Sequence, residues 1–135
     1  MADKADPQAL VEAAIAAMDK AYAPYSNFPV GAALRGSGGG LYVGCNVENA
    51  AYPQGWCAET SAIAAMVMDG EQRIAEIAVA GRGEALVTPC GGCRQRLREF
   101  ARDDLVVHIC GPEGLRKTVT LGELLPWSFG PENLT

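Results

Sequence analysis

Two cysteines spaced three apart are the residues of this chain most able to do chemistry. Cys90 and Cys93 lie in the segment Pro-Cys-Gly-Gly-Cys at positions 89–93. At the start of a helix, thiols at this spacing lie on the same side of the first turn and can bind one metal ion. The pair alone leaves two possibilities open. It fits a metal site, which needs further ligands, or a thioredoxin-like redox dithiol, which needs none.

The other potential ligands differ in their surroundings. Cys45 lies inside an apolar strand and Cys110 at the end of one, where a small buried hydrophobic residue accounts for each. The single histidine, His108, lies in a predicted strand. A lone histidine in a strand is more often a satisfied core or surface residue than a metal ligand, and we interpret His108 in this way.

Cys57 is the remaining candidate, because it opens a predicted helix and is followed by Ala-Glu. Together with Cys90 and Cys93 it provides thiolates for three positions and leaves the fourth open, which is the arrangement of catalytic zinc. Glu59 lies on the same helical turn and can reach a water at the open position. A carboxylate there can take a proton from the water and pass it to a substrate nitrogen. The alternative is an acidic residue favoured by the helix N-terminus.

Composition narrows the functional classes. The formal net charge is −5, and a surface of that sign repels phosphate backbones, so we expect no nucleic-acid partner. The apolar stretch 13–18 is far shorter than the roughly 20 residues of a membrane-spanning helix, so we expect no membrane partner. Cysteines without a secretory signal indicate reduced thiols and a cytoplasmic protein. Four arginines fall on one predicted helix, interleaved with apolar residues, which favours a solvated helix face: Arg94, Arg96, Arg98 and Arg102.

Periodicity and turn residues predict the elements that position these side chains. Helices are predicted at 7–21, 57–69, 91–102 and 121–125, and strands at 30–35, 41–47, 74–80, 105–109 and 117–120. In the predicted helix 57–69, residues 62–68 place apolar side chains on every side, which predicts that this helix is buried. The mostly apolar segment 74–80 predicts a central strand. The element order predicts an α/β fold in a single domain, 1–135, as a three-layer α-β-α sandwich around a mixed sheet of about five strands.

The motifs together resemble a known family. Cys-Ala-Glu at 57–59 followed by Pro-Cys-Gly-Gly-Cys at 89–93 resembles the zinc-dependent cytidine deaminases, in their compact homotetrameric type. The similarity covers nearly the whole chain after the first helix. It includes the segments 28–34, 44–50, 52–53, 94–95, 124–126 and 128–131.

The resemblance implies a metal, a reaction and a proton carrier. One Zn²⁺ per chain would be held by Cys57, Cys90 and Cys93. The reaction would be hydrolytic deamination of cytidine, and of deoxycytidine, to uridine or deoxyuridine and ammonia in pyrimidine salvage. Glu59 would move the proton of the attacking water to N3 of the base and then to the leaving ammonia. Two alternatives remain. One is a deaminase that acts on another aminopyrimidine, and the other is a non-catalytic zinc protein or a thiol redox protein.

The resemblance also implies how the substrate is bound. Asn46 and Glu48 would hydrogen-bond the ribose hydroxyls, Phe28 would pack on the pyrimidine ring, and Ala58 would offer backbone contacts to the base. Other residues would close the site of a neighbouring copy in a homotetramer: the loop from Ala50 to Tyr52, and Phe129.

One position departs from the family pattern. An arginine commonly follows the glutamate of Cys-Ala-Glu in the tetrameric family, and this chain has Thr60 there. Three thiolates on Zn²⁺ leave a formal charge of about −1, which opposes ionisation of a bound water. Helix N-termini at Cys57 and Cys90 can offset part of this charge. We expect a replacement cation to offset the rest, and Arg94 is the candidate that the sequence suggests.

Overall fold

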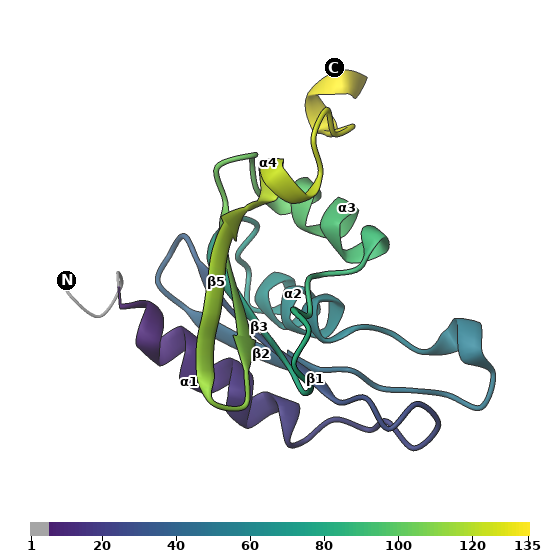
Figure 1. Cartoon of the computed structure of the whole chain (residues 1–135). Coiled ribbons are helices and arrows are strands. Elements are labelled where there is room, and N and C mark those ends of the chain that lie inside the picture. Colours follow the sequence, from purple (N-terminus) through teal and green to yellow (C-terminus); the bar gives the residue numbers. More distant parts are fainter. Residues whose placement is uncertain (1–5) are drawn as a thin grey trace.

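A five-stranded sheet in the order β2-β1-β3-β4-β5 organises the computed structural model, which describes residues 6–135 (Figure 1). In chain order the elements are α1 (Pro7–Met18), β1 (Val30–Gly36), β2 (Leu41–Cys45), the 3-10 turn η2 (Tyr52–Gln54), α2 (Ala58–Met68), β3 (Ile74–Gly81), α3 (Gly91–Phe100), β4 (Val106–Gly111), β5 (Gly114–Thr120), α4 (Leu121–Leu124) and the 3-10 turn η3 (Pro131–Leu134). None of the helices within residues 6–135 has the length and apolar character needed to cross a membrane.

The strand directions bring two helix starts to the same end of the sheet. β1 is antiparallel to both β2 and β3, whereas β3 is parallel to β4. β2, β3 and β4 therefore run in the same direction. The helices α2 and α3 follow β2 and β3 along the chain, so both begin beyond the carboxyl ends of these strands, where open α/β sheets place their sites.

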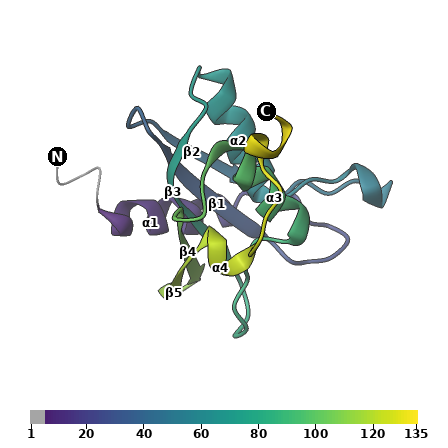
Figure 2. The ribbon, with the colours of Figure 1, turned by 90° about the horizontal axis from the view of Figure 1, so that it is seen from above.

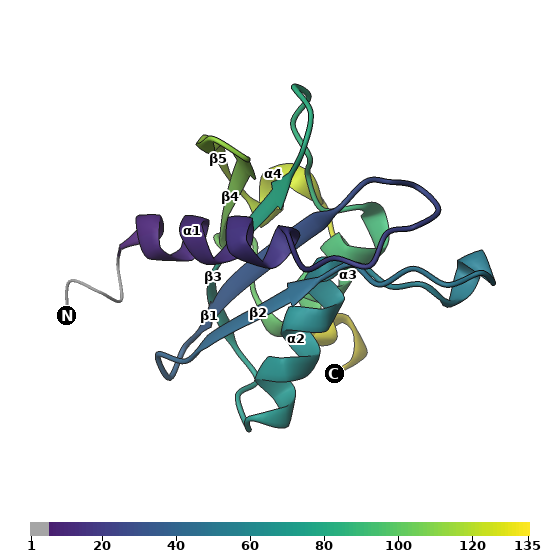
Figure 3. The ribbon, with the colours of Figure 1, turned by 90° about the horizontal axis from the view of Figure 1, so that it is seen from below.

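The helices cover both faces of the sheet, as the sequence predicts (Figures 2 and 3). On one face α1 packs through Leu10, Ala14 and Met18 onto alanines of β1 and β3. On the other face, the intervening residues of the same strands pack against α2 and α3, because successive strand residues point to opposite faces. The three-layer sandwich and the central position of β3 are confirmed.

Close packing of α2 against β2 fixes the start of that helix. A Cβ atom placed on Gly44 would come within 2.5 Å of the Ala58 carbonyl oxygen and 2.6 Å of the Ala62 nitrogen. Only glycine permits this approach, which sets the first turn of α2 directly on the strand backbone. The residues that open α2 therefore have a fixed position relative to the sheet.

Two sequence predictions about the helices are wrong. The first helix ends at Met18 rather than residue 21. Helix α2 is only half-buried, because the sheet covers one of its sides. Its outer side carries four exposed apolar residues, namely Ala64, Ala65, Val67 and Met68. Met68 is 89% exposed, so the apolar pattern in residues 62–68 does not indicate complete burial within one chain.

Candidate metal centre and active site

Three sulfur atoms meet where α2 and α3 begin. The Sγ atoms of Cys57, Cys90 and Cys93 all lie within 4.8 Å of one another, and those of Cys57 and Cys90 are 3.7 Å apart. Cys57 is the N-cap of α2 and Cys90 the N-cap of α3, and neither side chain caps its helix. Tetrahedral zinc with bonds of about 2.3 Å separates its sulfur ligands by about 3.8 Å. The sulfur positions therefore fit a single Zn²⁺.

Cys57 and Cys93 shift each other's pKa in opposite directions. The hydrogen bond that Cys93 donates to Cys57 raises the pKa of Cys93, and burial raises it further. The same hydrogen bond lowers the pKa of Cys57. Because zinc binds thiolates, metal binding would displace this proton. The helices α2 and α3 begin at Cys57 and Cys90, and the partial positive charge of their N-termini favours the thiolate form of these cysteines.

Glu59 lies beside the sulfurs in a small pocket. Its side chain is in the first turn of α2 and the residue is only 3% exposed. The pocket has a volume of about 190 Å³ and is lined by Phe28, Val30, Asn46, Cys57, Ala58, Glu59, Val87, Thr88 and Cys90. Burial raises the pKa of the Glu59 carboxyl. A carboxyl group with a raised pKa can hold and release a proton nearer neutral pH, as acid–base catalysis requires.

Asn46 lies in this pocket and also anchors its wall. Its side-chain oxygen accepts a hydrogen bond of 2.9 Å from the Val30 backbone N–H, and its Nδ2 donates one of 3.0 Å to the Phe28 carbonyl oxygen. Phe28 and Ala58 line the same pocket, and Phe28 is 44% exposed. Three of the predicted substrate-binding residues are therefore brought together beside Glu59.

Glu48 lies in a neighbouring pocket of about 310 Å³, which is lined by Tyr25, Ser26, Glu48, Asn49, Tyr52 and Gly55. Its carboxylate accepts the backbone N–H groups of Tyr25 at 2.9 Å and Ser26 at 3.1 Å, and also the Ser26 hydroxyl. The Ser26 hydroxyl is the main cause of its lowered pKa. In this structure Glu48 holds the turn at 25–26, outside the lining of the smaller pocket.

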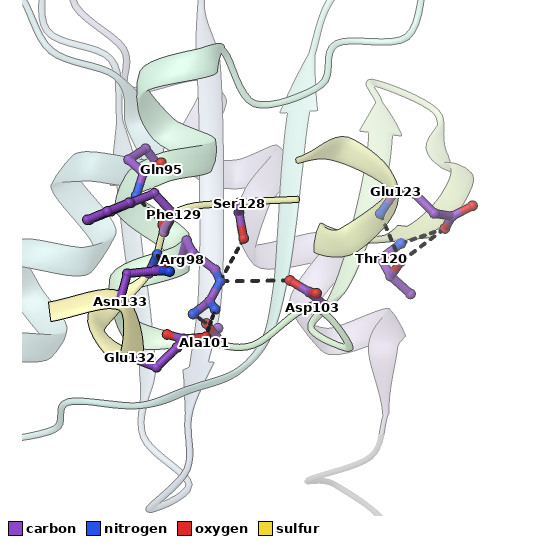
Figure 4. Close-up of polar contacts among 11 residues, drawn as sticks. Gln95, Arg98, Ala101, Asp103, Thr120, Glu123, Ser128, Phe129, Glu132 and Asn133 are labelled. Atoms are coloured by element: carbon purple, nitrogen blue, oxygen red, sulfur yellow. Dashed lines mark hydrogen bonds and ion pairs between the residues drawn. The ribbon is translucent and has the colours of Figure 1, made fainter. Parts of the chain in front are cut away.

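The pocket that contains Glu59 is not lined by Ala50, Tyr52 or Phe129 of the same chain. The arm, residues 46–56, extends beyond the sheet beside the loop 22–29 (Figure 3). Ala50 is exposed on the arm, and Tyr52 is 74% exposed, with its ring against that of Tyr25. Phe129 is 56% exposed on the C-terminal segment. Its carbonyl accepts a 2.8 Å hydrogen bond from Gln95 of α3 (Figure 4).

Two arginines of α3 contradict the predicted solvated face. Arg98 is buried, donates a 2.8 Å hydrogen bond to the Ser128 hydroxyl and pairs with Glu132 (Figure 4). Arg94 is half-buried and donates to the carbonyl oxygens of Pro89 and Leu124, both at 2.7 Å. The reason is that the chain after β5 returns and covers this side of the helix. The Arg94 guanidinium thus contacts no thiol, and the hypothesis that it faces the thiolates is wrong.

A different arginine contacts the metal centre. Nη1 of Arg96 lies 3.7 Å from the Sγ atom of Cys93. The hydroxyl of Thr60 lies 3.7 Å from the same sulfur. Sequence reasoning missed this contact, because it depends on how the Arg96 side chain folds back along α3.

The remaining histidine and cysteines lie outside the metal centre. The ring nitrogens of His108 contact Thr118 Oγ1 at 2.9 Å and Glu76 Oε2 at 2.5 Å, so this buried histidine is satisfied, as predicted. Cys110 is buried in the core beneath α1, which confirms its interpretation as a small core residue. Cys45 is half-buried, and its Sγ atom lies 3.6 Å from the Lys20 carbonyl oxygen.

The comparisons with known proteins agree with this geometry. The family model of the cytidine and deoxycytidylate deaminase zinc-binding region matches residues 4–109. The chain belongs to this deaminase family. The match includes all three clustered thiols, so the family's zinc binding and the sulfur geometry support the same cofactor, Zn²⁺.

Individual members of the deaminase family match along most of their length. The cytidine deaminase of Sporosarcina psychrophila is 40% identical over 130 residues, which cover 96% of each chain. The crystal structure of cytidine deaminase from Burkholderia pseudomallei is 45% identical with a TM-score of 0.85, covering 90% of this chain and 97% of that one. That of the Mycobacterium tuberculosis enzyme is 38% identical with a TM-score of 0.80, covering 93% of this chain and 98% of that chain. The chain is therefore an enzyme of the deaminase fold.

Proposed function

We propose that the protein hydrolyses the exocyclic amine at C4 of cytidine, and of deoxycytidine, in pyrimidine salvage. One observation carries the proposal: the buried carboxyl group of Glu59 lines the same small pocket as Cys57 and Cys90, two of the three clustered thiols. Zinc leaves a fourth position for water when three protein ligands hold it, and it lowers the pKa of that water. The names of the relatives support cytidine as the substrate.

Glu59 would carry the proton through the reaction. It would take one proton from the attacking water and deliver it to N3 of the base, and then take the second proton of the same water, left on the C4 hydroxyl, and pass it to the departing ammonia. Burial raises the pKa of Glu59, which suits a group that must be protonated for part of the cycle. Glu59 is also the only acidic residue that lines this pocket among the described residues.

The pocket can hold the base, and the adjacent groups can bind the sugar. Phe28 would pack against the ring, and the Ala58 backbone would meet the polar edge of the base. A side-chain amide offers two N–H donors and one acceptor oxygen, and Asn46 uses one N–H and the oxygen within the chain. Its second N–H could therefore meet a ribose hydroxyl. Glu48 would reach the sugar by exchanging its bonds to Ser26.

The exposed residues on the arm and the C-terminal segment support a homotetramer. Ala50, Tyr52 and Phe129 would complete the pocket of a neighbouring copy, because none of them lines the pocket of its own chain. The exposed apolar side of α2 offers a surface for such a contact, and aromatic residues of this kind are frequent at interfaces.

The free cysteines suit the reducing cytoplasm.

The alternatives predict different behaviour. A redox dithiol would use Cys90 and Cys93 without Cys57, yet the Cys57 sulfur lies within 3.7 Å of that of Cys90. A deaminase for another aminopyrimidine would share the metal centre and differ in the sugar contacts.

The test is the ultraviolet absorbance change as zinc-loaded protein converts cytidine, deoxycytidine, cytosine or CMP. The proposal expects fast conversion of the two nucleosides. It fails if zinc-replete protein leaves both of them unchanged or strongly prefers cytosine or CMP.

A further inference from the structure

With zinc bound, the metal centre would carry a net negative charge beside two helix N-termini. Three thiolates and one Zn²⁺ leave about −1, and each helix N-terminus contributes about half an elementary charge spread over its first turn. The helices α2 and α3 begin at Cys57 and Cys90, so their N-termini lie at the sulfurs. Thr60 is neutral, and the guanidinium of Arg94 binds carbonyl oxygens away from the sulfurs. A positive group close to one sulfur would act on that thiolate directly, whereas the charge of each helix N-terminus is spread over a whole turn.

Arg96 is in position to supply this charge. Its Nη1 lies 3.7 Å from the Cys93 sulfur, three residues earlier on the same helix. The guanidinium lies over Gly92, where a Cβ atom would come within 3.2 Å of Nη1. The missing side chain at Gly92 thus leaves room for the arginine to fold back toward the sulfur.

No acidic side chain in residues 6–135 forms an ion pair with Arg96. Its charge is therefore not neutralised by a carboxylate at salt-bridge distance. By contrast, Arg98 on the same helix is paired with both Asp103 and Glu132. The sulfur of Cys93 is the polar partner that the structure gives to Arg96.

Cys93 receives a second polar contact from the other helix. The hydroxyl of Thr60, on α2, lies 3.7 Å from the Cys93 sulfur. Thr60 and Arg96 also share the lining of one surface hollow between α2 and α3. Position 60 is thus within reach of the same sulfur, and this chain has a neutral donor there and a cation on the facing helix.

We infer that Arg96 is a positioning residue of the metal centre, which offsets the thiolate charge through Cys93 while Thr60 adds a neutral hydrogen bond to the same sulfur. Arg96 touches neither substrate nor metal in this role. It stabilises the loaded centre and withdraws charge from one ligand, so its removal should loosen the metal. The inference rests on the zinc centre of the proposed function and is independent of the substrate.

The first experiment measures zinc release from the loaded protein into an excess of a chromogenic chelator. Loss of a group that hydrogen-bonds a metal ligand costs about 10–100-fold in metal affinity. Because Arg96 is exposed, we expect the lower end, a release about tenfold faster for Arg96→Ala. Arg96→Lys keeps the charge and should release zinc more slowly than Arg96→Ala. Arg102→Ala is the matched control, since Arg102 is exposed just beyond α3, and it should release zinc at the wild-type rate.

The second experiment separates charge from helix structure. Thr60→Arg placed in the Arg96→Ala protein should restore slow zinc release, because it returns a cation to the same sulfur from the facing helix. In Co²⁺-loaded protein, Arg96→Ala should also shift the sulfur-to-cobalt charge-transfer band, since one thiolate loses its hydrogen bond.

Two results would overturn the inference. One is wild-type zinc release and an unchanged cobalt spectrum in Arg96→Ala. The other is fast release that neither Arg96→Lys nor the added Thr60→Arg slows, because that loss would come from damage to α3. Neither measurement uses cytidine, so protein that behaves as expected here but leaves cytidine intact would refute the proposed function alone.

Discussion

Replacing Glu59 by glutamine is the sharpest test of the proposed proton transfer. Glutamine has nearly the same size but cannot exchange a proton at neutral pH. No other acidic residue lines the pocket within the described part of the chain, so no neighbouring carboxylate can take over. Loss of a positioned acid–base group slows a reaction by about 10²–10⁴. At about 1.36 kcal/mol for each tenfold change, this loss corresponds to about 3–5 kcal/mol in the activation free energy.

The same substitution should leave the fold and the metal intact. Glu59 is 3% exposed and burial raises its pKa, which means that the surroundings disfavour its charged form. A neutral amide therefore removes a desolvation cost, and we expect the variant to unfold at the wild-type temperature or above it. Zinc content should stay at one per chain, because Glu59 is not a ligand. Glu99→Gln, at an exposed position of α3, is the matched control and should keep full activity.

Turnover is followed by ultraviolet absorbance with cytidine, on samples whose zinc content is known from elemental analysis. Near-normal turnover in a zinc-replete Glu59→Gln protein would refute the assignment of Glu59 as the proton carrier. Loss of zinc in this variant would refute the same assignment for another reason, since Glu59 would then be a metal ligand.

Three further predictions use other parts of the structure. Alanine in place of any one of the metal-binding cysteines should abolish the single zinc seen by elemental analysis, whereas Cys45→Ala should retain it, and zinc held equally by all variants would contradict the ligand set. Burial raises the pKa of Cys110 to about 11, so the folded chain holds this proton more tightly than the unfolded chain does. The stability that Cys110 contributes is complete below its unfolded pKa of about 8.5 and is lost as pH rises toward 11, by about 3 kcal/mol. Urea unfolding at both ends of this range should show a smaller decline for Cys110→Ala than for wild type, and equal declines would count against it. Asn46→Ala should lower kcat/KM for cytidine more than for 3′-deoxycytidine, by about 1–3 kcal/mol per lost sugar contact. An equal loss for both would assign Asn46 to loop anchoring alone.

The sequence was most informative where the chemistry is local. Cys90 and Cys93 are brought together by a single helical turn, and Glu59 lies in the same turn as Cys57, so spacing alone relates the members of each pair. The alternation of apolar residues in the strands, together with the element order, predicts the layers, because the connections are short and follow general rules of handedness. The fold class and the candidate metal ligands can therefore be predicted from the sequence.

Contacts across the fold could not be predicted in this way. Arg98 is buried because the C-terminal segment returns over α3 and brings Ser128 and Glu132 to it. Nothing in the arginine-rich pattern of α3 indicates that return. The choice between Arg94 and Arg96 likewise depends on which carbonyl groups approach the first turn of the helix. Glu48 holds a turn through local hydrogen bonds, which the residue type alone does not distinguish from a role in sugar binding.

The separation of the zinc ligands along the chain has a consequence for folding. Cys57 and Cys90 are 33 residues apart, and the segment between them includes β3, which pairs with β1 on one side and β4 on the other. In a zinc finger the ligands are close in sequence, and the metal can organise an otherwise unfolded peptide. Here an early ion would find only the Cys90–Cys93 pair, because closing the long loop to Cys57 costs entropy until the sheet holds its ends. Cys57 can complete the set only after β3 has entered the sheet, so tight zinc retention is a late event in folding and marks a chain whose central strand is in place.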